Sequence, residues 1–478
     1  MRTVLFTYNS IRNIIFFNFR LCKSKKERNC NKIMQTQSLG ASAPTQENKI
    51  ERVLDLSLFI GKGMLESGAS VSRVENAIER ICSAYNAKSI VVFSIPSLIL
   101  ATIEDQDGNK YTQSQRVYKI ANDLFKLERY NQLSRDICSQ KIPVKDALER
   151  AREVRKVYNY PFIVPIVGGG AIAGGFTLFF GGTFVDVLPA FIIGALMVFI
   201  NVLFFNKSFN SYASTFMLSF MAGALAILTA MVASALKIPC HTSPIMIGTI
   251  MVVVPGLLVC NAVRDLFVGD LLSGSVQILN GVITTLAIVA GYGVAMSLIK
   301  DFAVYLDVPT LDQLRYYLYT VSGCLIGTLG VCLFFKIDKK RLFTAMLNTA
   351  ITYGAYLLFY TIWSDLFACN LIATVIASII SEIMARIEKA PASVFLVPAI
   401  IPLVPGGMLY RAMNSLIIGD FAQAGVYGFD ALLIFLGIAL GLSLIAAIFQ
   451  LIAPIKFRKR YAVSVLANLF KNTTKLDK

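Results

Sequence analysis

A Val-Pro-Gly motif occurs twice in the sequence, at 254–256 and again 150 residues later at 404–406. Proline lacks a backbone N–H and obstructs a carbonyl of the preceding helical turn, and glycine tolerates the dihedral angles of a chain break. Both motifs lie in apolar segments, where backbone groups released by a break must be satisfied by protein or by water in a cavity. The motifs therefore predict two interrupted helices whose free N–H and C=O groups bind a polar solute. The alternative is that the prolines only kink the helices.

The match between the two copies continues without a gap to Gly269-Asp270 and Gly419-Asp420. The intervening stretches, NAVRDLFVGD and RAMNSLIIGD, carry one asparagine and one arginine in swapped order. An arginine beside each break is a candidate partner for a substrate carboxylate, although arginines near helix ends also reach toward lipid headgroups. The predicted substrate-binding residues are Pro255, Gly256, Asn261, Arg264, Pro405, Gly406, Gly407, Arg411 and Asn414.

Glu382 and Arg386 stand four residues apart inside another apolar segment, so they share one face of a helix. They form either an intrahelical ion pair or a site at which a carboxyl group carries a proton. Glu382 is the predicted proton-coupling residue. The amides of Asn201, Asn348 and Asn370 also lie in apolar segments, where they either bind substrate or join helices.

The sequence has one histidine, His241, and nine cysteines, none of them in CxxC spacing. These residues predict no Cys/His metal site and no cofactor. The hydrolase motifs HExxH, GxGD and GxSG do not occur, and neither does the nucleotide-binding motif GxxxxGKS/T. The pattern therefore favours binding and transport over an enzyme, and no catalytic residue is predicted.

Apolar runs long enough to cross the hydrocarbon core of a bilayer recur from residue 161 onward. The chain is 56% hydrophobic and only 15% charged, with a mean hydropathy of +0.64, which excludes a soluble globule of this length. We therefore predict an α-helical polytopic membrane protein with about ten spans. They lie near 161–181, 184–205, 212–236, 243–267, 276–299, 317–335, 342–361, 366–385, 392–417 and 427–453.

The excess of positive charge lies outside this apolar region. Lys and Arg outnumber Asp and Glu in residues 1–160 and 456–478, whereas residues 161–455 are neutral overall. Because flanks rich in Lys and Arg stay in the cytoplasm, both termini are predicted to be cytoplasmic, which requires an even number of spans. Asp186, near the start of the span 184–205, then falls on the external side. Topology accounts for the whole basic excess, so nucleic-acid binding is not predicted.

Five spans separate the two Val-Pro-Gly copies, and an odd number reverses their direction across the membrane. The two halves are therefore predicted to be five-helix inverted repeats, an architecture in which secondary transporters bind solute between broken helices. The predicted divisions are a leader that is disordered or precedes the true start (1–49), a cytoplasmic α+β domain (50–158), repeat 1 (159–300), an external linker (301–316), repeat 2 (317–455) and a basic cytoplasmic tail (456–478).

The amphipathic pattern of the α+β domain predicts a helix from Glu51 to a stop at Gly68, followed by a helix with a capping box between Ser72 and Glu75. Runs rich in Val and Ile predict strands, with a hairpin turn at Asp107-Gly108. The predicted strands are 89–94, 98–103 and 110–112, and two further helices are predicted near 117–134 and 143–157.

Three stretches resemble a known family. HTSPIMIGTIMVVVPGLLVCNAVRDLFVGD (241–270) resembles the signature of the threonine/serine exporter family, and GKGMLESGASVSRVENAIERI (61–81) resembles the start of its cytoplasmic domain. PASVFLVPAIIPLVPGGMLYRAM (391–413) is similar to the small membrane subunit that some bacteria encode separately, so both halves are fused here. The resemblance covers roughly 50–454. It implies export of threonine and serine driven by the proton-motive force, with dicarboxylates such as succinate as the substrate of the split-gene relatives.

The sequence thus predicts a secondary active exporter of small carboxylate metabolites, with threonine and serine as substrates. A succinate-like dicarboxylate exporter is the alternative, because two arginines, Arg264 and Arg411, suit two carboxylates. A membrane-embedded hydrolase and a passive channel are alternatives from other classes. The expected partners are the amino acid or dicarboxylate, protons and the lipid bilayer, with homo-oligomerisation left open. The expected location is the inner or plasma membrane, crossed many times.

Overall fold

The computed structural model describes residues 49–118, 123–140, 142–157, 160–205, 210–256, 258, 261–262, 265–266, 269–298 and 312–473, with side chains, apart from 49, 140 and 205, up to residue 449. The chain divides into two compact units, residues 1–52 and 53–478, and only residues 49–52 of the first are described. The predicted leader, except residue 49, and the predicted external linker up to residue 311 therefore lie outside the described residues.

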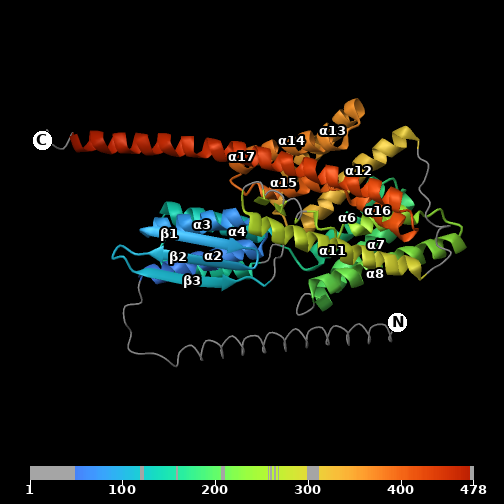
Figure 1. Cartoon of the computed structure of the whole chain (residues 1–478), viewed down its shortest axis with the longest axis horizontal. Helices are drawn as coiled ribbons and strands as arrows, with labels where there is room; N and C mark the ends of the chain where they lie inside the picture. Colours follow the sequence, from blue (N-terminus) through green and yellow to red (C-terminus); the bar gives the residue numbers. More distant parts are fainter. Residues whose placement is uncertain are drawn as a thin grey trace, which may run out of the picture. The chain divides into compact units, whose positions relative to one another are not determined.

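The first part of the described chain, which we call the amino-terminal segment (residues 49–157), combines four helices with one sheet (Figure 1). Its elements are α2 (Lys49–Glu66), α3 (Val71–Ala84), β1 (Ser89–Ile95), β2 (Leu98–Glu104), β3 (Lys110–Arg116), α4 (Leu124–Gln140) and α5 (Val144–Lys156). The strands are antiparallel in the order β1-β2-β3, and the predicted turn at Asp107-Gly108 is present, with Gly108 at φ 90°. The three predicted strands are confirmed, and β3 is longer than predicted.

The predicted capping box of the second helix is wrong. Helix α3 begins at Val71 with Ser70 at the N-cap, two residues earlier than the predicted N-cap Ser72. Glu75 instead accepts hydrogen bonds from the Ser94 backbone N–H (2.7 Å) and hydroxyl (3.1 Å) on β1. Burial raises the pKa of Glu75, although these two hydrogen bonds oppose the rise. The Glu75 carboxylate therefore bonds to a neighbouring strand and not to its own helix, and local spacing does not reveal this tertiary contact.

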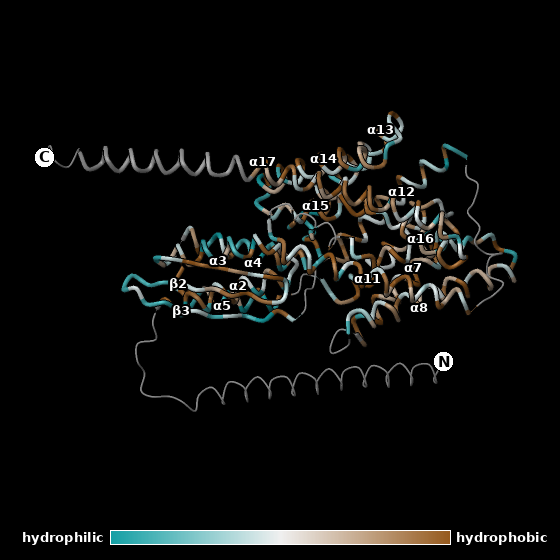
Figure 2. Tube along the Cα trace, viewed as in Figure 1, coloured by the Kyte–Doolittle hydropathy of each residue, from teal (hydrophilic) through white to brown (hydrophobic). Residues whose placement is uncertain are grey.

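The second part of the chain is helical and apolar, as the brown tube in Figure 2 shows. Its elements are α6 (Ile163–Phe179), α7 (Phe184–Ile200) with a π turn η1 (Asn201–Phe205), α8 (Ser211–Ala235), α9 (Thr242–Ile250), α11 (Leu271–Ser297), α12 (Gln313–Phe334), η3 (Lys339–Arg341), α13 (Leu342–Trp363), α14 (Leu366–Ile387), α15 (Ser393–Ile400), η4 (Ile401–Leu403), α16 (Gly406–Ile417) and α17 (Phe421–Thr473).

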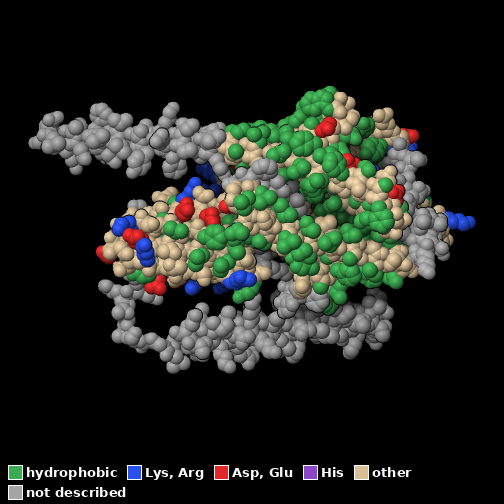
Figure 3. Space-filling model, viewed as in Figure 1, with side chains coloured by type: hydrophobic (Ala, Val, Ile, Leu, Met, Phe, Trp, Pro, Cys, Tyr) green, Lys and Arg blue, Asp and Glu red, His purple; other side chains and the backbone are tan. Residues whose placement is uncertain are grey.

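Eight helical segments of the described chain are long and apolar enough to cross a membrane. They coincide with eight of the predicted spans. They are Phe184–Phe204, Ser211–Ala235, Leu271–Ser297, Gln313–Phe334, Lys339–Trp363, Leu366–Ile387, Ser393–Ile417 and Phe421–Phe449. Of the two remaining predicted spans, the first is the shorter apolar helix α6, and the second, 243–267, contains α9 and then residues that are only partly described. Hydrophobic side chains cover most of the face over these helices, whereas charged ones gather over the amino-terminal segment (Figure 3).

Helices α6 and α12 pack tightly and antiparallel because their contact faces are made of glycine. A Cβ atom at Gly323 would lie 2.5 Å from the backbone N of Phe179, and one at Gly330 would lie 2.5 Å from that of Ile172. Without side chains between them, the two backbones approach as closely as in small-residue interfaces of other membrane helices. The carboxyl end of α12 thus lies beside the amino end of α6, where the Tyr160 hydroxyl donates to the Ile337 carbonyl (3.0 Å).

This interface yields a first prediction. Gly330→Ala forces a methyl group into the α6 backbone, and overpacking of this kind costs about 1–3 kcal/mol. We expect a lower melting temperature of the purified protein in detergent. Gly354→Ala on α13 is the matched control, because a Cβ atom there meets nothing within 4 Å. Equal melting temperatures for the two variants would contradict the glycine-mediated packing.

The helices of the two halves pair in the same way. Helix α8 packs against α11 in the first half, and the helices at the corresponding places in the second half, α14 and α17, pack against each other. Helices α7 and α8 both contact α9, just as α13 and α14 both contact α15. In each half, therefore, a short helix that ends at a Val-Pro-Gly motif is held among longer ones.

Candidate functional site

Both predicted breaks are present in the structure. Helix α9 ends at Ile250, and the N–H groups of Val253 and Val254 then both donate to the Ile250 carbonyl (2.9 and 3.0 Å), so the regular ladder stops before Pro255. In the second half α15 ends at Ile400, a 3-10 turn follows, and α16 starts after Pro405. The first motif therefore follows the end of a half-helix and the second separates two half-helices, as the loss of a proline N–H and the freedom of glycine require.

The two breaks contact each other. A Cβ atom at Gly256 would lie 2.9 Å from Val404 Cγ1 and 3.4 Å from Val404 Cβ. A Cβ atom at Gly406 would collide with the sulfur of Met251, and one at Gly407 would lie 2.8 Å from the Phe180 ring. Glycine is thus needed at each motif for close approach, and the two unwound segments, 150 residues apart in sequence, form one crossing. We call residues 251–256 and 401–407 the crossing.

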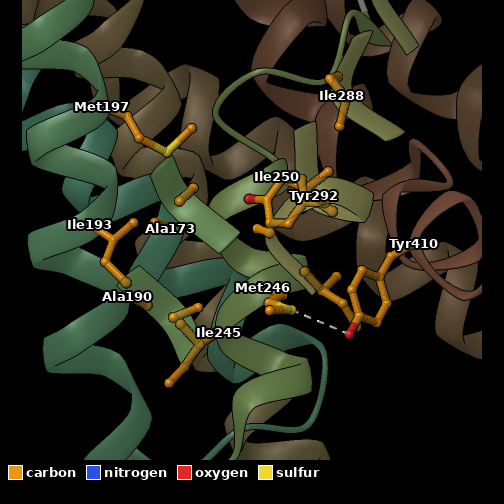
Figure 4. Packing of buried hydrophobic residues seen from close by; sticks show 14 of the residues in the cluster. Ala173, Ala190, Ile193, Met197, Ile245, Met246, Ile250, Ile288, Tyr292 and Tyr410 are labelled. Carbon is orange, nitrogen blue, oxygen red and sulfur yellow. Dashed lines mark hydrogen bonds between the residues drawn. The ribbon is translucent and has the colours of Figure 1, made fainter. Parts of the chain in front are cut away.

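Buried hydroxyl groups surround the crossing on the side of α9. Helix α16 packs against α9 and α11, and the Tyr410 hydroxyl lies 3.6 Å from Met246 Sδ, as Figure 4 shows. The hydroxyl groups of Thr249 and Tyr292 lie 2.9 Å apart, and both residues are fully buried. Tyrosine hydroxyls inside an apolar core need such partners. The core near the crossing is therefore mostly apolar, but it contains the buried hydroxyl groups of Thr249, Tyr292 and Tyr410.

A small cavity of about 40 Å³ adjoins the second break. Its polar lining includes Asn261, Ser393 and Arg73, and Leu396 and Val397 line its apolar wall. The Arg73 guanidinium donates to Ser393 Oγ at 3.5 Å. The volume suffices for a few water molecules. Among the described residues, the cavity joins one predicted binding residue, Asn261, to two polar residues that the sequence did not single out.

The predicted binding residues do not all meet. Pro255, Gly256, Pro405, Gly406 and Gly407 lie at the crossing, and Asn261 lines the cavity.

Arg411 is exposed on α16, with its guanidinium 5.9 Å from the Tyr427 ring, and Asn414 is half-buried on the same helix. Arg264 lies outside the described residues. Neither arginine is thus placed against the crossing by the described structure, and their predicted role as carboxylate partners remains a prediction.

The residue predicted to couple protons, Glu382, is half-buried on α14 and lines neither the crossing nor the cavity. Arg386 is not its ion-pair partner among the described residues, because its guanidinium stacks on the Phe449 ring at 4.6 Å. Asn348 joins helices, as one of its two predicted roles requires: its side-chain N–H donates to Ser381 Oγ (2.9 Å) and to the Phe395 carbonyl (3.2 Å).

Asp186 was assigned only to the external side of the membrane, and its burial was not predicted. Its side chain is fully buried at the start of α7, where it forms a capping box with Thr183 and accepts from His241. The spacing Thr183-x-x-Asp186 is a capping-box signal that agrees with the predicted start of this span at residue 184. The contact with His241 joins residues 55 apart, and no local pattern predicts it.

The amino-terminal segment is bound to the loops that precede α13 and α15. Arg341 donates to Glu388 (2.6 Å) and Glu128 (3.3 Å), and Lys336 pairs with Asp123 at 3.0 Å. The Leu124 N–H donates to the Phe335 carbonyl at 3.0 Å, so α4 starts directly on the end of α12. This network holds the amino-terminal segment beside the cavity, which Gly68 to Arg73 also line in part.

Long apolar helices, two of them broken and crossing, define the chain as a multi-pass membrane protein of the transporter kind. Comparison with known families agrees. The threonine/serine exporter model ThrE matches residues 55–299, and a second threonine/serine exporter model, ThrE_2, matches residues 320–448. The chain therefore belongs to the threonine/serine exporter family, whose members are transporters rather than enzymes. The family predicted from the sequence is confirmed.

Two curated relatives span most of the chain. The “Probable threonine/serine exporter” of Mycobacterium tuberculosis is 24% identical over 396 residues, covering 78% of this chain and 72% of the relative. The “Threonine/serine exporter” of Corynebacterium glutamicum is 24% identical over 383 residues, covering 78% of this chain and 77% of the relative. No solved structure matches the chain.

Proposed function

We propose that the chain exports threonine and serine across the inner or plasma membrane, driven by the proton-motive force. The observation that carries the proposal is the crossing, at which two proline-interrupted helices meet inside a chain of the exporter family. Half-helix ends at such a crossing provide polar groups in an apolar surrounding without any charged side chain.

The chemistry of the crossing suits a zwitterion. Helix α16 starts at Gly406, and the N-terminus of a helix carries partial positive charge that favours a carboxylate. Helix α9 ends at Ile250 with its carbonyl end toward Pro255, and such an end favours a cation such as an ammonium group. A substrate with one carboxylate and one ammonium group, as in threonine and serine, satisfies both ends.

The inverted repeat is part of the proposal, and packing supports it. The start of α9 lies at the carboxyl end of α6, where a Cβ atom at Gly182 would lie 3.0 Å from Pro244 Cβ. The start of α15 lies at the opposite end of the α6–α12 pair, because Ser393 and Phe335 line the same cavity. The two broken helices thus enter the bundle from opposite ends, as ten spans with both termini in the cytoplasm require. Rocking of one half against the other then alternates access to the crossing.

Transport by purified protein in proteoliposomes tests the proposal. We expect counterflow of labelled threonine and serine, and stimulation of efflux by an imposed proton gradient. Labelled succinate is tested as the competing substrate. If succinate is transported and threonine and serine are not, the substrate is a dicarboxylate and not an amino acid. Uptake without stimulation by substrate on the other side would indicate a passive channel instead, and hydrolysis without uptake would indicate an enzyme.

The two predicted arginines yield a second prediction. We expect Arg411→Ala to lower threonine export several-fold without loss of membrane insertion, because an arginine beside each break is proposed to attract the substrate carboxylate. Arg386→Ala is the matched control, since Arg386 is also an exposed arginine stacked on an aromatic ring. Labelled-threonine efflux from cells, normalised to protein in the membrane, measures the effect. Unchanged export in Arg411→Ala would remove this residue from the substrate site.

A further inference from the structure

A buried aspartate and the single histidine of the chain form one hydrogen-bonded pair at the start of α9. Asp186 has no exposed surface, and its Oδ1 accepts from the His241 backbone N–H at 2.8 Å. Its Oδ2 accepts from the Thr183 backbone N–H (2.8 Å), the Thr183 hydroxyl (2.9 Å) and His241 Nδ1 (3.1 Å). Four donors therefore converge on one buried carboxyl group.

This geometry assigns the proton positions of the imidazole ring. Because Asp186 Oδ2 is an acceptor already shared by two Thr183 donors, Nδ1 carries the proton that it donates, and Nε2 is then the basic nitrogen. The His241 side chain keeps 15% of its surface exposed, whereas the Asp186 side chain keeps none. A proton from water can therefore reach the ring, and the protonated ring faces the Asp186 carboxyl group.

Few other ionisable groups face the pair. Helices α6 and α9 contain none, α7 contains only Asp186, and α8 contains only Tyr212 at its far end. The segment before α9 adds Lys237 and Cys240. Burial first, and then the Asp186 charge, raise the pKa of Cys240 to about 12, so this thiol stays protonated.

Helix α16, which packs on α9, brings two further ionisable residues. Its Tyr410 lies against Met246, and its exposed Arg411 is stacked on Tyr427. Among the described groups, His241 is therefore the one that brings a ring nitrogen able to bind a proton beside this carboxyl group.

The pair is connected to the crossing by α9 itself. His241 is the N-cap of α9, and the helix runs from there to the first break in nine residues. Thr242, the first of these residues, is fully buried, and its hydroxyl oxygen has no hydrogen-bond partner. An unpartnered buried hydroxyl beside the pair marks a place where water or a proton donor is expected.

We propose that His241, held by Asp186, binds the proton whose entry drives export. This inference rests on the proposed function and replaces Glu382 as the proton carrier. A proton enters from water onto Nε2, while Nδ1–H stays bonded to Asp186, so the neutral ring becomes an imidazolium paired with a carboxylate. Protonation adds a positive charge to a donor that already faces the carboxylate, so the hydrogen bond becomes an ion pair, and the attraction between opposite charges is stronger in an apolar surrounding than in water. Protonation therefore fixes the starts of α7 and α9 to each other, and release of the proton loosens α9 and the break at its end.

Proteoliposomes with two readouts test the proposal. The first readout is threonine efflux driven by an imposed pH gradient, and the second is threonine counterflow at equal pH, which needs no net proton movement. We expect His241→Gln to lower the ratio of gradient-driven efflux to counterflow at least tenfold, because glutamine still donates a hydrogen bond but does not titrate. Asp186→Asn should lower the ratio in the same direction. A ratio equal to that of the wild type in His241→Gln would overturn the proposal, as would a loss confined to Glu382→Gln.

Asp365→Asn is the matched control for a purely structural effect. Asp365 is also an N-cap carboxylate, accepting from the Ala368 N–H at 2.6 Å, but it has no histidine partner. The ratio of gradient-driven efflux to counterflow in Asp365→Asn should equal that of the wild type. If His241→Gln does not reach the membrane, a second measurement uses the wild type and Asp186→Asn proteins purified in detergent. Threonine is added to each protein, and a pH indicator follows the release of protons. Equal release from both would contradict the proposal. Counterflow without any gradient effect in the wild type would instead refute the proton drive itself.

Discussion

Cysteines at positions 256 and 404 are expected to form a disulfide that stops transport. In Gly256→Cys/Val404→Cys the two Cβ atoms would lie near 3.4 Å apart, close to the 3.5–4.5 Å usual for disulfides. The double substitution also relieves its own crowding, because the Val404 methyl groups that a side chain at 256 would meet are removed. A covalent link across the crossing prevents the two broken helices from separating, so alternating access is blocked and more than nine-tenths of the export should be lost.

The measurement is labelled-threonine efflux before and after oxidation, in a variant whose nine native cysteines are replaced by serine or alanine. Reduction with a thiol reagent should restore export, which separates a lock from misfolding. The single variants Gly256→Cys and Val404→Cys serve as controls and should not respond to oxidant. If the disulfide forms and export continues at the original rate, the crossing does not need to open, and the proposed mechanism is wrong.

Local backbone chemistry explains why the crossing could be predicted from the sequence. Proline and glycine act on the residues next to them, so the breaks at Pro255 and Pro405 follow directly from the motifs. The hairpin at Gly108 and the helix stop at Gly68 were predictable for the same reason, since both glycines adopt positive φ angles. The apolar runs likewise predicted the long helices, because their length must match the bilayer.

Side-chain roles were predicted less well because they depend on helix rotation and on distant partners. Arg411 lies six residues after its proline, yet the rotation of α16 directs it toward Tyr427. Glu75 has a capping-box spacing, yet it bonds to a strand 19 residues away. Asp186 was assigned to a side of the membrane, but neither its complete burial nor its contact with His241 was predicted. Each of these outcomes depends on a tertiary contact, and a single sequence shows none.

The glycine pattern of α6 and α12 was visible but not interpreted. Gly168 and Gly175 face Gly323 and Gly330 across an interface in which backbone meets backbone. In sequence, the glycines of two helices about 150 residues apart do not show which helix each will meet. In the proposed repeat α6 and α12 are equivalent helices, and such an equivalence is what would suggest that they pair.

Arg341 is the residue whose loss should most weaken the link between the amino-terminal segment and the helices. It contacts Glu388 at 2.6 Å and Glu128 at 3.3 Å, and all three side chains are about four-fifths buried or more. Removing one member of a buried ion pair costs about 3–5 kcal/mol, because the remaining charge has no partner. Arg341→Glu goes further, since it would place three carboxylates together.

We therefore expect Arg341→Glu to lose most of its threonine export and to be cut by protease within residues 49–157, where the wild type resists. The exchange Arg341→Glu/Glu388→Arg restores one pair and should recover part of both readouts. Lys340→Glu is the control. Lys340 is the cation next to Arg341 in sequence, but it is exposed, and it belongs to no ion pair among the described residues. Protease resistance and efflux together decide the role of the segment. Loss of resistance with full export would mean that the contact is structural only, whereas loss of both would show that transport requires the amino-terminal segment to stay beside the cavity at the second break.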